Sequence, residues 1–210
     1  SAIAMGLAIC TKLLPLMFLP FFIRRLGWKK ATTYFAIVGV TLALLFSPLL
    51  NGVFFGNIGS SINLYFQRFE FNGGIYYLLR WIGKTIYGYN LIRFIGPGLA
   101  LIVFIGICRK AWIDQDLSDR NLFSQELFAL SLFLFCTTTI LPWYLTGIIF
   151  LTIFTPFRYA LVWSYLIIWT YINYSYPAYF ENLWVVGIEY LLLYGYLFYE
   201  YGKTHTRVYD

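Results

Sequence analysis

The side chains of this sequence that are best suited to chemistry are a few charged residues set among long apolar stretches. Lys12 lies about nine residues inside the first apolar stretch, where an unpaired ammonium group would cost about 3 kcal/mol in hydrocarbon. Lys12 therefore needs a partner, and two partners fit: a lipid-linked phosphate in an interior cavity, or a carboxylate of the protein itself. Glu189 is the natural carboxylate, because it is the one acid well inside an apolar segment.

Three further cations, Arg68, Arg80 and Lys84, lie within residues 51–90. Arg80 and Lys84 are four residues apart, so on a helix both side chains can reach one anion. A phosphate gains charge-assisted hydrogen bonds from such a pair. The sequence thus predicts that these three residues and Lys12 bind a phosphate group or another part of a substrate. The alternative is that Arg80 and Lys84 only attract anionic lipid headgroups.

Two acids, Glu70 and Glu181, are expected on the same side of the molecule as residues 51–90. A general base that deprotonates a hydroxyl group is often a carboxylate. Glu70 is the better candidate for that role, with a structural contact to Arg68 as the alternative. The sequence has no cluster with metal-ligand spacing, no glycine-rich phosphate loop and no Ser/His/Asp set. We therefore expect neither a metal nor a cofactor.

The composition decides the class of protein. The chain of 210 residues is 60% hydrophobic and only 11% charged, with a mean hydropathy of +0.71, and a water-soluble domain does not expose so much apolar surface. Its net charge of +6 comes from basic residues placed between apolar runs, as in membrane proteins, which argues against nucleic acid as a partner. We expect one all-α transmembrane domain over residues 1–210, cut from a longer chain.

Seven apolar segments are candidates to cross about 30 Å of hydrocarbon. They are residues 3–23, 31–50, 91–108, 126–141, 144–157, 159–174 and 183–201. The third is expected to be broken at Pro97, and residues 144–174 can instead form one re-entrant segment, which leaves five or six spans. Arg24 and Arg25 place the end of the first segment in the cytoplasm. By the same rule, the residues expected inside are Trp28, Asp116 and His205, and those expected outside are Asn63, Asn72 and Tyr179.

Residues 51–90 are predicted to form a structured extracytoplasmic loop. Its glycine and asparagine residues are expected to break any helix before residue 74 into short pieces. Residues 75–87 have the apolar periodicity of an interfacial helix. In this helix we expect four residues to pack down, namely Ile75, Leu79, Ile82 and Ile86. Arg80 and Lys84 are expected to face a polar chamber between loop and bundle.

Three stretches together resemble a known family. They are TKLLPLMFLPFFIRR from residue 11, LYFQRFEFNGGIYYLLR from residue 64 and LPWYL from residue 141. They are similar to the C-terminal half of bacterial polytopic glycosyltransferases of the GT-C class, the mannosyltransferase-like enzymes that use a polyprenyl-phosphate sugar. The resemblance implies transfer of one hexose, with inversion, to a glycan or lipid acceptor on the outer face of the inner membrane. It also implies that the catalytic acid lies upstream of this chain.

Two other classes of function remain open. A transporter or flippase subunit would use Lys12 and Glu189 as a coupled pair in a polar pathway. A non-catalytic membrane scaffold would use neither residue in particular. In all three cases the lipid bilayer is an expected partner, and in the first case a polyprenyl-phosphate sugar is another.

Overall fold

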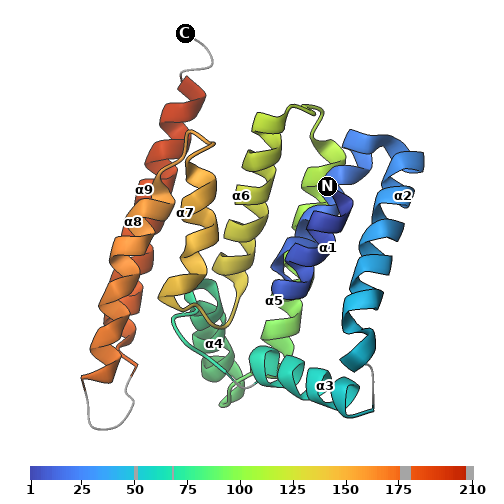
Figure 1. Cartoon of the computed structure of the whole chain (residues 1–210). Helices are drawn as coiled ribbons and strands as arrows, with labels where there is room; N and C mark the ends of the chain where they lie inside the picture. The colour runs from blue at the N-terminus through green and yellow to red at the C-terminus, as the bar shows by residue number, and fades with distance from the viewer. Residues whose placement is uncertain (50–51, 68, 176–180, 207–210) are drawn as a thin grey trace.

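The structure is a computed structural model of the chain, and it describes residues 1–49, 52–67, 69–175 and 181–206. This part is all-α, with 83% of the chain helical and no β-strand, as predicted. The elements in chain order are α1 (Ala2–Thr11), the 3-10 helix η1 (Leu14–Phe18), α2 (Leu19–Phe46), η2 (Ser47–Leu49), α3 (Gly52–Gln67), α4 (Gly74–Tyr87), α5 (Ile92–Ile113), α6 (Asp119–Cys136), η3 (Pro142–Leu145), α7 (Thr146–Thr152), α8 (Tyr159–Leu166), η4 (Ile167–Tyr174) and α9 (Leu183–Thr206). Figure 1 shows α5 to α9 side by side; α2 packs against α5, and α1 packs against α2.

The first apolar segment, residues 3–23, does not form the single helix predicted for it. Helix α1 ends before Lys12, whose backbone is extended (φ −158°, ψ 130°), and η1 follows. Pro15 explains the break, because it has no N–H to donate to Thr11 and its ring would clash with that carbonyl group. The segment is therefore two short helical pieces joined by a turn at Lys12.

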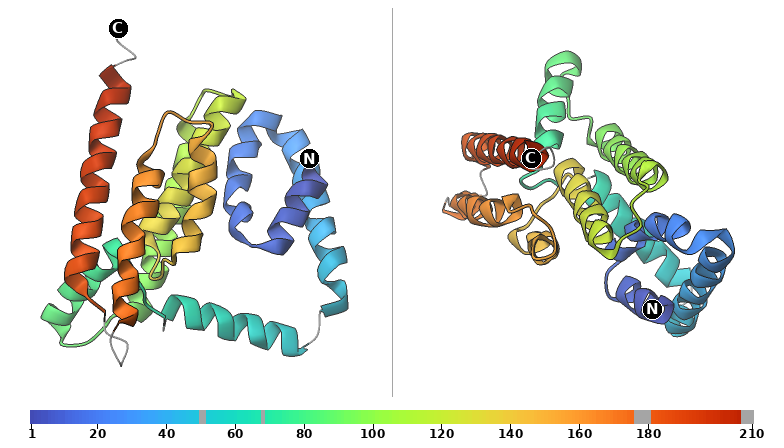
Figure 2. Two further views of the ribbon diagram at one scale, coloured as in Figure 1. Left: turned by 60° about the vertical axis from the view of Figure 1, so that its left-hand side comes forward. Right: turned by 90° about the horizontal axis from the view of Figure 1, so that it is seen from above.

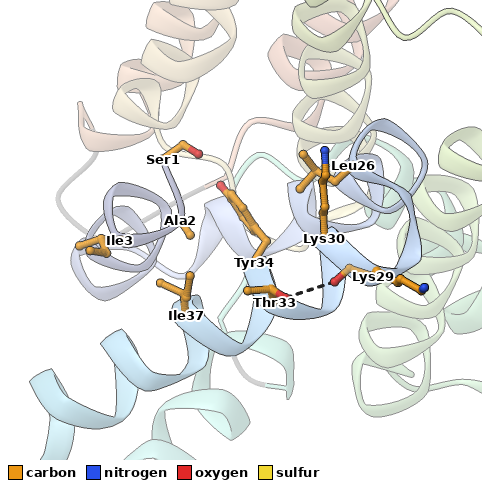
Figure 3. A pocket seen from close by; sticks show the side chains of 9 residues that line it. All are labelled: Ser1, Ala2, Ile3, Leu26, Lys29, Lys30, Thr33, Tyr34 and Ile37. Carbon is orange, nitrogen blue, oxygen red and sulfur yellow. Dashed lines mark hydrogen bonds between the residues drawn. The ribbon is translucent and has the colours of Figure 1, made fainter.

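The two pieces form a hairpin. Ser1 and Ala2 line a pocket together with Leu26 and Lys30, so the chain returns to the end of the molecule at which α1 began (Figure 3). Gly27 has φ +72°, a value that glycine adopts without strain, and there α2 bends and runs to the opposite end (Figure 2). The prediction that residues 3–23 cross from one side to the other is therefore wrong.

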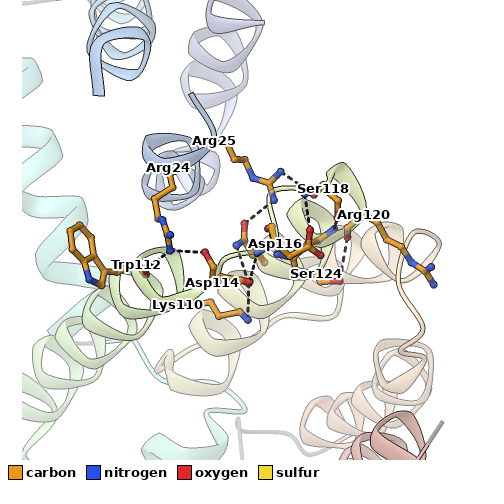
Figure 4. A network of polar contacts seen from close by, with 11 residues as sticks. Arg24, Arg25, Lys110, Trp112, Asp114, Asp116, Ser118, Arg120 and Ser124 are labelled. Atoms are coloured by element: carbon orange, nitrogen blue, oxygen red, sulfur yellow. Dashed lines mark hydrogen bonds and ion pairs between the residues drawn. The ribbon is translucent and has the colours of Figure 1, made fainter. Parts of the chain in front are cut away.

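Two arginines fix this hairpin to the loop between α5 and α6 (Figure 4). Arg24 donates to the carbonyl oxygens of Trp112 and Asp114 at 2.6 and 2.8 Å. Arg25 donates to those of Leu117 and Ser118 at 2.7 and 2.9 Å. We call this the Arg24 end of the molecule, and the end that carries α3 and α4 the α4 end (Figure 1).

The two ends separate the residues that were expected on opposite sides of a membrane. The bend of α2 after Arg25, the α5–α6 loop and the last turns of α9 are at the Arg24 end, as predicted for Trp28, Asp116 and His205. Helix α3, which contains Asn63, and the residues before α4, which include Asn72, are at the α4 end. Tyr179 lies outside the described residues. Which end faces the cytoplasm stays a prediction.

Among the described residues, only two stretches are long and apolar enough to cross a membrane by length and composition. They are Leu14–Leu49 and Ile92–Ile113, so the seven-span bundle is not confirmed. Helix α5 runs without a break through Pro97, contrary to the prediction. Residues 144–174 form two legs, α7 and then α8 with η4, which start and finish at the α4 end (Figure 1). Whether they are two spans or one re-entrant segment stays a prediction.

Residues 51–90 contain two helices, α3 and α4. The sequence predicts short helical pieces before residue 74 and one helix after it. Helix α3 is continuous for 16 residues through Gly56 and Gly59, because a glycine costs a helix only about 1 kcal/mol and does not by itself end it. The predicted helix 75–87 is confirmed as α4, which ends at Gly88 in the left-handed conformation (φ 78°). Helix α3 runs across the α4 end, and α4 extends away from the bundle (Figures 1 and 2).

Candidate functional site

The site begins with a short backbone connection at the α4 end. Phe71 donates its N–H to the Thr138 carbonyl at 3.1 Å and accepts from the N–H of Ile140 at 2.8 Å. A Cβ at Gly73 would lie 2.9 Å from the Thr138 carbonyl oxygen, so only glycine allows this close approach. The connection holds the residues before α4 against those after α6, and it fixes the positions of Glu70 and Asn72 on either side of Phe71.

An ion cluster covers this connection. The Arg80 guanidinium contacts the carboxylates of both Glu70 and Glu181, and all three side chains are at most 17% exposed. The ring of Tyr77 lies 4.1 Å from the guanidinium carbon, close enough for a cation–π interaction. We call these three charged residues the Glu70–Arg80–Glu181 cluster.

The two carboxylates of the cluster have different surroundings. Glu70 accepts hydrogen bonds at both oxygens, from Arg80 and from the Asn90 side-chain amide. Glu181 has longer contacts, 3.5 Å to Arg80 and 3.4 Å to the N–H of Asn72. Burial, with a smaller contribution from the Glu70 charge, raises the pKa of Glu181 to about 7, against the lowering effect of the Asn72 hydrogen bond. Glu181 is therefore suited to accept a proton near neutral pH.

A second, deeper layer joins the cluster to the bundle. The Asn72 side chain donates to Glu189 Oε1 at 3.1 Å, and the Trp163 indole N–H donates to the same oxygen at 2.9 Å. Tyr190 donates its hydroxyl to the Asn72 carbonyl oxygen at 2.7 Å. Asn72 has φ +52°, which asparagine tolerates better than most residues. Asn72 thus contacts Glu181 through its N–H and Glu189 through its side chain.

Glu189 bonds to residues of this deeper layer and does not form the ion pair predicted with Lys12. Glu189 is fully buried, and its contacts are with Asn72 and Trp163. Lys12 is exposed and was expected to be buried, and its ammonium nitrogen lies 4.9 Å from the centre of the Tyr144 ring. The break at Pro15 is the physical reason, because it places Lys12 at the turn of a hairpin and not inside a helix. In the described part of the chain, Lys12 forms no ion pair.

Helix α4 packs against the bundle with only part of the face that was predicted to pack down. Its buried residues are Tyr76, Tyr77 and Gly83. Ile75 and Leu79 pack against the core as expected, whereas Ile82 and Ile86 are 39% and 67% exposed. The side of α4 that faces the bundle also carries Tyr76, which donates to Asn90, and Arg80, which pairs with the two acids.

The predicted cations are therefore not gathered at one anion site. Arg80 pairs with carboxylates and does not face an open chamber, and Lys84 is exposed on the surface of α4. Arg68 lies outside the described residues, so the contact predicted between it and Glu70 is not described. Sequence reasoning missed Asn72, Asn90 and Trp163. The run Asn72-Gly73-Gly74, which begins two residues after Glu70, signals only a break in a helix, and Trp163 is one of many aromatic residues.

Comparison with known proteins gives no family. No protein-family model, no curated protein and no solved structure matches the chain. Within the described ranges, no three side chains of His, Cys, Asp or Glu are grouped as metal ligands. The site is therefore defined by its own geometry: a paired-carboxylate cluster around one arginine, with a buried polar layer beneath it.

Proposed function

We propose that the chain is the C-terminal transmembrane part of a GT-C class glycosyltransferase. In this proposal it helps to transfer a hexose from a polyprenyl-phosphate sugar to a glycan or lipid acceptor on the outer face of a bacterial inner membrane. The observation that carries the proposal is the Glu70–Arg80–Glu181 cluster at one end of a strongly apolar helical structure. Carboxylates and arginine suit the hydroxyl groups of a sugar, since they offer acceptors and donors in fixed positions.

The surface of the helices supports a membrane location. Large apolar side chains are exposed along α5 and α9, where a water-soluble protein would carry polar residues. Examples are Leu101, Phe104, Leu191 and Phe198, each at least 58% exposed. Four exposed tryptophans lie towards the two ends, as in the aromatic belts of membrane proteins. They are Trp28 and Trp112 near the Arg24 end and Trp143 and Trp184 near the α4 end.

In the proposed reaction, the acceptor hydroxyl oxygen forms a bond to the anomeric carbon of the hexose while the bond to the polyprenyl phosphate breaks. The hydroxyl proton goes to a carboxylate, which the resemblance assigns to the N-terminal half of such enzymes. Glu181 holds the acceptor by accepting a hydrogen bond from a hydroxyl group, and Arg80 and Glu70 keep the site in place. We assign Lys12 to the donor phosphate, because it forms no ion pair with the described residues, whereas Arg80 is paired with two carboxylates.

A transfer assay on the full-length protein in proteoliposomes tests this function, with a polyprenyl-phosphate hexose as donor. We expect Glu181→Gln to raise KM for the acceptor with kcat little changed, because an amide supplies a weaker acceptor for the hydroxyl hydrogen bond. If Glu181 takes the proton itself, kcat falls instead by about 10²-fold or more. Asp119→Asn, an exposed acid at the Arg24 end, is the control.

Lys12→Ala tests the donor side of the proposal in the same assay. We expect it to raise KM for the polyprenyl-phosphate donor, and Lys12→Arg to retain most of the binding. Two results together would instead identify the protein as a transporter. These are no sugar transfer by the full-length protein, and uptake of an ion or solute that Glu189→Gln abolishes.

A further inference from the structure

A pocket in the bundle lies away from the Glu70–Arg80–Glu181 cluster. It has a volume of about 390 Å³ and lies between α6, the first residues of α8 and the C-terminal half of α9. Its wall is made mainly of apolar side chains. They include Leu127, Phe128, Leu132, Phe135, Leu197 and Phe198. This volume is within the range of small-molecule sites in proteins.

The polar groups inside this pocket do not offer free hydrogen bonds. Ser131 and Tyr159 line the pocket and are hydrogen-bonded to each other through their hydroxyl groups. A ligand inside the pocket thus meets an apolar surface, as a hydrocarbon chain would require.

The position of the pocket limits the length of such a chain. At one limit, Phe135 stacks on Trp163 with 5.0 Å between ring centres, and Trp163 contacts Glu189 in the deeper layer of the site. At the other limit, Ser124 and Tyr201 line the pocket near the Arg24 end. Eleven residues of α6 separate Phe135 from Ser124, which is about 16 Å at 1.5 Å per residue. This is about half of a 30 Å hydrocarbon core, the depth of one leaflet.

Cations flank the limit of the pocket near the Arg24 end. Arg120 precedes Ser124 by one helical turn on the same face of α6, and the Ser124 hydroxyl donates to the Arg120 carbonyl oxygen at 3.3 Å. In Figure 4 the Arg120 side chain points away from the network that holds Arg24 and Arg25. Arg158 stands between Phe157 and Tyr159, which both line the pocket. The Arg158 guanidinium, however, already donates to the carbonyl oxygens of Thr152, Thr155 and Phe157. The exposed Arg120 is therefore the cation near this mouth that can meet an anionic group.

Two acids, Glu200 and Asp119, lie near this mouth, and their surroundings decide how far they oppose an anionic ligand. Glu200 is 8% exposed, and its carboxylate accepts hydrogen bonds from the backbone N–H groups of Arg158 and Tyr159 at 2.8 to 3.0 Å. Its charge is therefore directed to the first turn of α8, where the helix dipole favours an anion. Asp119 is exposed next to Arg120 at the start of α6.

We propose that this pocket binds an anionic phospholipid from the leaflet at the Arg24 end. One acyl chain occupies the pocket between α6 and α9, and the phosphate group is held at Arg120. The one-leaflet depth and the position opposite the Glu70–Arg80–Glu181 cluster fit a membrane phospholipid, and not the longer chain of a polyprenyl donor whose phosphate is at the α4 end. The inference rests on the membrane location in the proposed function and is independent of sugar transfer.

Lipid binding to the purified 210-residue chain in neutral detergent tests the proposal. The probes are phosphatidylglycerol, phosphatidylcholine with the same acyl chains, and polyprenyl phosphate, measured by native mass spectrometry and by the shift of the melting temperature. We expect phosphatidylglycerol to bind most tightly. Arg120→Ala should weaken it about fivefold, because one cation near an anionic lipid contributes about 1 kcal/mol. Arg109→Ala, which removes an exposed cation near the end of α5, should leave binding unchanged.

A pocket-filling variant separates the acyl chain from the headgroup. Ser124→Trp should abolish binding of both phospholipids while the melting temperature without lipid is retained, and Phe128→Trp serves if the first variant does not fold. Equal affinity for the two phospholipids, or an Arg120→Ala variant that binds normally, would overturn the headgroup site. Selective binding of polyprenyl phosphate that Ser124→Trp abolishes would make this a donor pocket and refute the proposal. Failure of sugar transfer in the full-length protein would leave these binding results unaffected.

Discussion

Trp163 of α8 donates its indole N–H to Glu189 of α9 at 2.9 Å, and both side chains are fully buried. The same carboxylate oxygen accepts the side chain of Asn72, which comes from the segment before α4. Three parts of the chain that are far apart in sequence are thus joined at one buried oxygen atom. Glu189 is therefore an organising residue for the α4 end and is not the partner of Lys12.

Trp163→Phe should destabilise the fold. The substitution keeps most of the ring volume but removes one of the two donors to a buried carboxylate, which costs about 1 to 3 kcal/mol. The measurement is the melting temperature of the purified chain in detergent. Trp143→Phe is the matched control, because Trp143 is 57% exposed, and it should change stability by less than about 0.5 kcal/mol. Equal effects of the two substitutions would show that the hydrogen bond to Glu189 contributes little.

Arg80→Ala and Lys84→Ala should differ strongly, although the two cations are one turn apart on α4. Loss of Arg80 leaves Glu70 and Glu181 without their common cation in a mostly buried place, and we expect a loss of about 2 kcal/mol or more. Lys84 is exposed, so its removal should stay within about 0.5 kcal/mol. Chemical unfolding of both variants measures this difference. If both variants instead weaken phosphate binding without loss of stability, the prediction that Arg80 and Lys84 share one anion site holds.

The pKa of Glu181 makes the stability depend on pH. Burial raises it from 4.5 to about 7, so between these values the native state binds more protons than the unfolded state. The free energy of unfolding should therefore fall as the pH rises from 4.5 to 7, and stay lower above pH 7. Glu181→Gln should remove the contribution of Glu181 to this fall in stability. The measurement is the melting temperature of the wild-type chain and of the variant at several pH values between 4.5 and 7.

Glu70→Gln tests the cause of the raised pKa. The Glu70 charge is one of the two influences that raise the pKa of Glu181, and its removal also leaves Arg80 free to pair more closely with Glu181. We expect the pKa of Glu181 to decrease, so the pH-dependent fall in stability should end at a lower pH. An unchanged pH profile would mean that burial alone sets this pKa.

Gly74 should not tolerate a side chain, because a Cβ at this position would lie 2.4 Å from the Tyr190 ring. Gly74→Ala would displace Tyr190, whose hydroxyl binds the Asn72 carbonyl oxygen, and we expect a loss of about 1 to 3 kcal/mol. Gly98→Ala is the control in another helix, since nothing lies within 4 Å of a Cβ there, and it should be neutral or stabilising by up to about 1 kcal/mol. Melting temperatures of the two variants provide the comparison.

The sequence alone determined the class of the fold and the helix that carries the central arginine. An apolar content of 60% with few charges leaves long helices as the expected form of the chain, and the periodicity of residues 75–87 located α4 to within one residue. Both are local properties, since helix periodicity depends on neighbours three and four residues away. The grouping of Glu70, Glu181 and Glu189 as the acids of interest also came from composition, because acids are rare in this chain.

Only the tertiary structure decided which of these charges meet. Glu70 and Arg80 are 10 residues apart, but Arg80 and Glu181 are 101 apart and Trp163 and Glu189 are 26 apart. Such pairs depend on how α4, α8 and α9 pack, and no spacing rule predicts a contact between elements. The hairpin at Lys12 is the intermediate case. Pro15 signals a break in the sequence, but the return of the chain to the Arg24 end depends on the packing of α1 against α2 and on the contacts of Arg24 and Arg25 with the α5–α6 loop.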